Sequence, residues 1–173
     1  MHPGVQIPPA ATFVHGIRDC DVADAPTIVA AWSEVSSQLD TCRVVGAYNW
    51  PYDSAILERL LGPLWLFRAN VSNLIVDPLV VARYVGKHWA GSGRHRLGEV
   101  VKRLGIVVEG ALHRARADAV AAGKVLLELR DHLPTGDADV ANFMVRGRRA
   151  QTQERQEYLE RKRRCGGDER RKG

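Results

Sequence analysis

The stretch that decides the fold is Arg-Val-Val-Gly-Ala-Tyr-Asn-Trp-Pro-Tyr-Asp, residues 43–53. Residues 43–47 form a short run that is long enough for a buried strand, because β-branched side chains favour an extended backbone. A helix is predicted to begin at Asp53 and to end near Leu61, before Gly62-Pro63. Ligands gather beyond the carboxyl ends of strands in open α/β sheets, so Asp53 is predicted to lie at a ligand site.

Strands and helices alternate on both sides of this stretch, which indicates an α/β layer. Upstream, apolar side chains recur three or four residues apart and predict an amphipathic helix over residues 26–39. The proline-rich residues 1–12 are expected to be extended, and Asp19-Cys20-Asp21 is expected to lie in a surface loop. Downstream, the pattern predicts one strand and three helices, over residues 71–76, 78–85, 97–104 and 115–133.

Residues 135–173 differ in character from residues 1–134, and we expect them to form a basic helical extension to the domain. From Arg146 onward the chain has eleven Lys or Arg against five Asp or Glu. The net positive charge of this segment therefore exceeds the net charge of the whole chain, which is +5. A basic tail attracts polyanions, so nucleic acid is an expected partner. The alternative is a tail that is simply solvated. One turn of the extension is expected to dock on the domain through Val140, Phe143 and Met144.

A second informative stretch is His-Arg-Ala-Arg-Ala-Asp, residues 113–118. Side chains five residues apart on one helix point about 140° apart. His113 and Asp118 can therefore converge only if His113 lies in the preceding loop and Asp118 in the first helical turn. The helix dipole there favours the ionised form of Asp118, which is the form that binds a metal. Taken alone, such a pair is more often a helix cap or a surface pair.

Residues 47–53 and 113–118 together resemble the second and third motifs of the DnaQ-like 3′→5′ exonucleases. They are similar to the subclass in which a histidine precedes the last metal-binding aspartate by five residues. Residues 14–17, Val-His-Gly-Ile, resemble the segment before the first helix of that family, and Asp77-Pro78-Leu79 occupies another family position. The resemblance continues, in family order and spacing, to about Leu133.

The resemblance implies a ribonuclease H-like exonuclease fold that lacks its first strands. The first motif of the family, an Asp-x-Glu pair on an N-terminal strand, supplies two of its four metal-binding carboxylates. Residues 1–18 of this sequence contain neither Asp nor Glu. We therefore expect a fragment or a mis-assigned start, with a truncated exonuclease domain over residues 1–134.

The resemblance also implies which residues form the site. Two Mg²⁺ or Mn²⁺ ions would be held by carboxylates that include Asp53 and Asp118, and the ions would assist hydrolysis of a phosphodiester bond. His113 would take the proton from the attacking water, because the ordinary pKa of histidine suits that task near neutral pH. The implied substrate-binding residues are Asn49, Trp50 and Tyr52.

These expectations define a hydrolase acting on nucleic-acid 3′ ends, with single-stranded ends as the implied substrate and a replication or repair protein as a possible partner. Activity is expected to be feeble or absent, because two carboxylates are too few for two dications. The alternatives are a non-catalytic nucleic-acid-binding remnant and a module that another chain completes. No apolar run approaches the roughly 20 residues that cross a bilayer, so no membrane association and a cytoplasmic location are expected.

Overall fold

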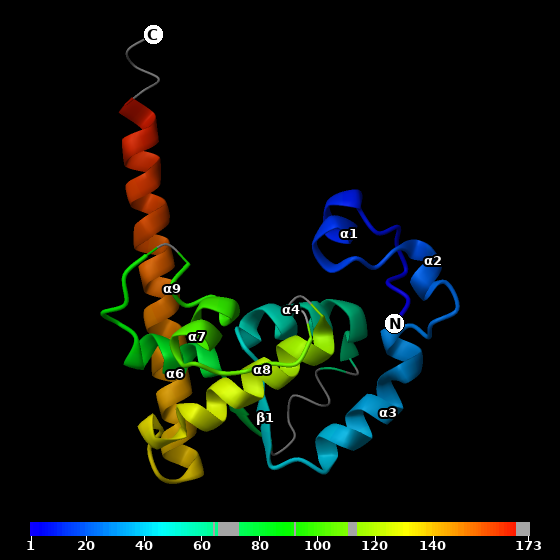
Figure 1. The fold of residues 1–173 in the computed structure, drawn as a ribbon, viewed down its shortest axis with the longest axis horizontal. Coiled ribbons are helices and arrows are strands. Elements are labelled where there is room, and N and C mark those ends of the chain that lie inside the picture. Colours follow the sequence, from blue (N-terminus) through cyan, green and yellow to red (C-terminus); the bar gives the residue numbers. More distant parts are fainter. Residues whose placement is uncertain (64, 66–72, 92, 111–113, 169–173) are drawn as a thin grey trace.

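The computed structural model describes residues 1–63, 65, 73–91, 93–110 and 114–168. In this part of the chain the fold is mixed α/β, with many helices around a small parallel sheet (Figure 1). Strand β1, Val44–Gly46, pairs with β2, Leu74–Val76, and Val45 lies opposite Ile75. Both predicted strands are thus confirmed in a shorter form. Residues 71 and 72 of the predicted second strand lie outside the described residues.

Each strand leads into a helix at its carboxyl end. Strand β1 is followed by α4, Trp50–Leu61, and β2 is followed by α6, Pro78–Val85. Because the strands are parallel, the N-termini of α4 and α6 lie at the same edge of the sheet. This edge is the place at which the sequence predicts a ligand site.

The main core lies between β2, α6 and two later helices, α7 at Leu97–Arg103 and α8 at Ala115–Glu128. Side chains with no exposed surface meet here: Val81 from α6, Val100 from α7 and Val125 from α8. Helix α8 also packs on β1, where a Cβ atom added to Gly46 would lie 3.5 Å from Leu126. The predicted helix over residues 115–133 ends earlier than expected, and a short 3₁₀ turn, Arg130–His132, follows it.

A second apolar cluster joins α3, Ile28–Asp40, to α4. Trp32 of α3 meets Trp65 edge to face, with 6.1 Å between the ring centroids, and Leu61 is buried beside them. The amphipathic helix predicted over residues 26–39 is therefore confirmed. Its N-cap is Thr27, whose hydroxyl accepts a hydrogen bond from the backbone N–H of Ala30.

The N-terminal segment differs from the sequence prediction. Helix α1, Pro9–His15, begins inside the stretch that the prolines predict to be extended, because proline is tolerated in the first helical turn. Gly16 ends the helix with φ at 71°, the left-handed conformation that favours glycine. The expected surface loop at residues 19–21 is part of a short exposed helix, α2, Asp19–Val22.

The C-terminal helix α9, Asp137–Asp168, starts as part of the core and then projects away from it (Figure 1). Val140 and Met144 are buried, and a Cβ atom on Gly147 would lie 2.3 Å from the Val80 side chain of α6. More of the C-terminal extension therefore packs on the domain than the single turn that the sequence predicts. A division of the chain at residue 134 stays a prediction. No helix in the described ranges is long and apolar enough to span a bilayer.

Candidate nucleic-acid and metal-binding site

The turn between β1 and α4 is held by a carboxylate from the neighbouring strand. The backbone N–H groups of Asn49 and Trp50 donate hydrogen bonds to the two oxygens of Asp77, at 2.9 and 3.0 Å. Asp77 also accepts from the backbone N–H of Leu79 at 2.9 Å and thereby caps α6. Asn49 adopts φ of 67°, a left-handed conformation that asparagine tolerates better than most residues.

This arrangement explains why α4 begins at Trp50, three residues before the predicted start. The Asp77 carboxylate captures the N–H groups that the first helical turn leaves unpaired, and Pro51 in that turn has no N–H to satisfy. Asp77 is entirely buried. Burial raises the pKa of this carboxyl, while its three N–H donors and the positive charge of Arg148 act in the opposite direction.

Asp77 is the residue that the sequence prediction missed. It belongs to the family resemblance, but the sequence alone assigns it no role at the site. The available signal is an aspartate directly before a proline at a predicted helix start, which is typical of an N-cap. That signal predicts the hydrogen bond to Leu79. It cannot reveal the bonds to Asn49 and Trp50, which are 28 and 27 residues away in the sequence.

Asp53 lies in the first turn of α4, at the predicted edge of the sheet, and is half-buried. Burial raises the pKa of its carboxyl, and the negative charge of Asp77 raises it further. A carboxylate in this setting gains from a nearby cation, because the cation offsets both the lost hydration and the repulsion from Asp77.

Asp118 lies in the first turn of α8, where the sequence predicts it, and is half-buried. Its backbone N–H donates to the carbonyl of Arg114, and the adjacent Ala117 is buried. Helix α8 packs on β1, and Asp118 and Asp53 each lie in the N-terminal turn of a helix. His113 lies outside the described residues, so the convergence of the three groups stays a prediction.

The three predicted substrate-binding residues have different surroundings. Asn49 is exposed, and Tyr52 is 65% exposed. The Trp50 ring packs against Trp65, with 5.7 Å between the centroids, and is half-buried. Asn49 and Tyr52 can therefore contact a ligand without repacking, whereas Trp50 also stabilises the second apolar cluster.

Residues 86–91 and 93–96 are loop residues that approach this turn, and a hydrogen bond from Tyr48 holds them. The Tyr48 hydroxyl donates to the backbone carbonyl of His95 at 2.6 Å. The His95 ring donates to the carbonyl of Gly86 and stacks on Trp89, and burial lowers the pKa of this histidine. The loop thus holds the imidazole in place and presents Arg94 and Arg96 beside the turn.

The described residues offer few candidate ligands for a metal ion. No group of three or more His, Cys, Asp or Glu side chains suited to a metal ion occurs among them. Mg²⁺ is commonly bound through one or two carboxylates together with substrate phosphates, which is what Asp53 and Asp118 could offer. Two closely spaced dications need additional carboxylates, so Asp53 and Asp118 alone do not make a two-metal site.

Two comparisons with known proteins give matches. The family model described as Exonuclease, of the RNase T type, matches residues 1–126. A DNA polymerase III subunit epsilon-like protein of Rhodobacter capsulatus is 32% identical over 130 residues, which cover 75% of this chain and 18% of that protein. The chain therefore spans less than a fifth of the length of this relative. No solved structure matches the chain significantly.

Proposed function

The chain belongs to the RNase T-type exonuclease family, and from this premise we propose that it acts at the 3′ ends of nucleic acids. Enzymes of this family typically use divalent metal ions. In our proposal Asp53 and Asp118 hold one such ion, and His113 is the general base. Asn49, Trp50 and Tyr52 contact the terminal nucleotides.

The observation that carries the proposal is the Asp77-held turn. It places Asp53 one helical turn beyond the carboxyl end of β1, in a setting where burial and a second carboxylate favour a bound cation. This is the edge at which open α/β sheets bind their ligands. Asn49 is an exposed residue at the same edge, which leaves room for a nucleotide.

The ligand set limits the activity that we propose. Asp53 and Asp118 fall short of the carboxylates that two dications require, so these 173 residues are proposed to bind nucleic acid and to hydrolyse it slowly or not at all. Complete hydrolysis by a two-metal mechanism would require further carboxylates. The name of the Rhodobacter relative also suggests a replicative polymerase as partner, which remains part of the proposal.

Mg²⁺ is expected to strengthen binding of single-stranded DNA by the full chain, and Asp53→Asn is expected to remove that effect. One ion shared between Asp53 and a phosphate should increase affinity roughly tenfold, about 1.4 kcal/mol. Fluorescence anisotropy of an oligonucleotide labelled at its 5′ end, in Mg²⁺ and in EDTA, measures the difference. Release of 3′ nucleotides is followed on gels of the same samples.

Asp131→Asn is the matched control, because Asp131 is exposed and distant from the sheet edge in sequence. This variant should respond to Mg²⁺ as the unmodified chain does. The proposal fails if Mg²⁺ leaves the affinity of the unmodified chain unchanged, or if Asp53→Asn responds like the control.

A further inference from the structure

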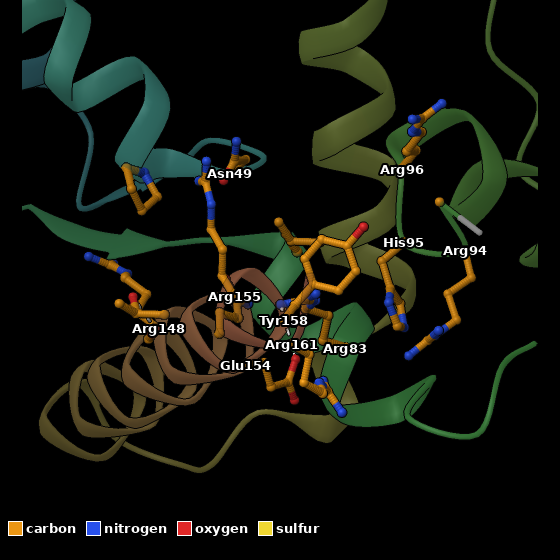
Figure 2. A pocket seen from close by; sticks show the side chains of 15 residues that line it. Asn49, Arg83, Arg94, His95, Arg96, Arg148, Glu154, Arg155, Tyr158 and Arg161 are labelled. Atoms are coloured by element: carbon orange, nitrogen blue, oxygen red, sulfur yellow. Dashed lines mark hydrogen bonds and ion pairs between the residues drawn. The ribbon is translucent and has the colours of Figure 1, made fainter. Parts of the chain in front are cut away.

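A cavity of about 810 Å³ lies beside the candidate site, between α9, the loop at residues 93–96 and the start of α4 (Figure 2). We call it the arginine pocket because six arginines line it. They come from α6, the loop and α9: Arg83, Arg94, Arg96, Arg148, Arg155 and Arg161. Asn49 and Pro51 form its border with the Asp77-held turn, so the pocket opens next to the proposed 3′-end site.

The pocket has a large excess of positive charge. Glu154 is the only carboxylate among the described residues that line it, and it lies 3.6 Å from the guanidinium of Arg83. In the part of the chain that the structure describes, no ion pair engages the other five arginines. Six arginines and one glutamate line the pocket, and such an excess of like charge favours an anionic ligand.

Two buried donors of the pocket lack acceptors. Arg148 Nε and Gln151 Nε2 are both buried atoms, and neither has a hydrogen-bond partner in the described structure. An unpaired buried donor is unfavourable, and an oxygen-rich ligand would satisfy it. The positive charge of Arg148 also acts on Asp77, where it opposes the rise in pKa that burial causes, and this connects the pocket to the turn before α4.

The length of the pocket favours a chain of phosphates over a single one. Arg148 and Arg161 are on one continuous helix and are separated along it by about 20 Å, which exceeds the reach of one phosphate group. Figure 2 shows Arg155 extending toward Asn49, and Tyr158 between Arg155 and His95. Tyr158 is largely exposed, and an exposed ring among arginines is typical of sites that stack unpaired bases.

We propose that the arginine pocket binds the phosphate backbone of a single-stranded nucleic acid whose 3′ end lies at the Asn49 turn. This inference rests on the proposed function and extends it by assigning the path of the strand. Helix α9 is then a wall of the substrate groove, and its basic residues have a defined ligand.

The test is the affinity of the full chain for a fluorescein-labelled oligothymidine, measured in EDTA at several salt concentrations. The variant Arg155→Glu/Arg161→Glu reverses two exposed charges inside the pocket. The control Arg149→Glu/Arg163→Glu makes the same charge change on the same helix, at exposed residues that do not line the pocket. Arg94→Glu provides an independent variant on the loop, and circular dichroism reports whether each variant is folded.

The pocket variant should bind at least about tenfold more weakly than the control at low salt. The slope of log affinity against log salt should become shallower by about 0.7 for each phosphate that the variant no longer neutralises. Arg94→Glu should weaken binding in the same direction. Equal reductions in affinity for the two double variants would overturn the inference, because they would show a general attraction of the basic helix.

Other results would also overturn it. In one such result, polyglutamate binds the chain as tightly as oligothymidine does, and the pocket variant weakens both interactions equally. This would indicate an acidic protein as the ligand. Absence of oligothymidine binding in EDTA is another such result. Because no metal is present in these measurements, they are independent of the Mg²⁺ response of Asp53, and either proposal can fail without the other.

Discussion

Replacing Asp77 with alanine is expected to lower the free energy of unfolding by about 3–5 kcal/mol, a large share of the stability of a small domain. The change removes a fully buried carboxylate that accepts from three backbone N–H groups, those of Asn49, Trp50 and Leu79. Each unsatisfied buried donor costs about 1–3 kcal/mol. The expected loss of stability is smaller than the sum of these three penalties, because burial of the ionised carboxylate is itself unfavourable, as the raised pKa of Asp77 indicates.

Urea unfolding followed by circular dichroism measures this effect. Asp77→Asn keeps one acceptor oxygen and should fall between the unmodified chain and Asp77→Ala. Asp131→Ala removes an exposed aspartate and should change stability by less than about 0.5 kcal/mol. A decrease below about 1 kcal/mol for Asp77→Ala would show that the turn before α4 does not depend on this carboxylate.

Met144→Ala is expected to lower the free energy of unfolding by about 2–4 kcal/mol. Met144 is 1% exposed and belongs to the same core cluster as Val76, Val81 and Val125. Its sulfur also accepts a hydrogen bond from the backbone N–H of Asp77 at 3.3 Å. Truncation therefore leaves a cavity next to the residue that organises the site.

Val145→Ala is the matched control for the helix, because Val145 follows Met144 directly and is exposed. Its effect should stay within about 0.5 kcal/mol, since exposed substitutions have small effects. The comparison, made by urea unfolding, decides whether the start of α9 is part of the domain or a detachable tail. Equal and small effects of the two substitutions would contradict the core position of α9.

Local patterns in the sequence predict most of the fold. The helix at residues 78–85 has the predicted bounds, because Pro78 follows an aspartate cap and a helix-ending Gly86 comes after Val85. Helix α3 follows the predicted apolar spacing. Helix α1 is not predicted from the sequence, because several prolines together indicate an extended chain. A single proline is nevertheless compatible with a first helical turn.

The site could be predicted only in part, because its decisive contacts join distant segments. The spacing of residues 113–118 correctly predicts Asp118 in a first helical turn. The hydrogen bonds of Asp77 to the Asn49 turn depend on β2 lying beside β1, which no local pattern specifies. The sequence likewise shows a basic tail, but not that Arg155 of the tail and Arg94 of a loop line the same pocket.

The central claim is that Asp53 and Asp118 bind the same divalent ion, and paramagnetic broadening of NMR signals by Mn²⁺ tests it most directly. As Mn²⁺ is added to the isotope-labelled chain, the backbone amide signals of Asp53 and Asp118 should broaden together. They should do so at lower Mn²⁺ concentrations than the signal of the exposed Asp131. Separate broadening of Asp53 and Asp118, or broadening only at the concentration that affects Asp131, would contradict the account.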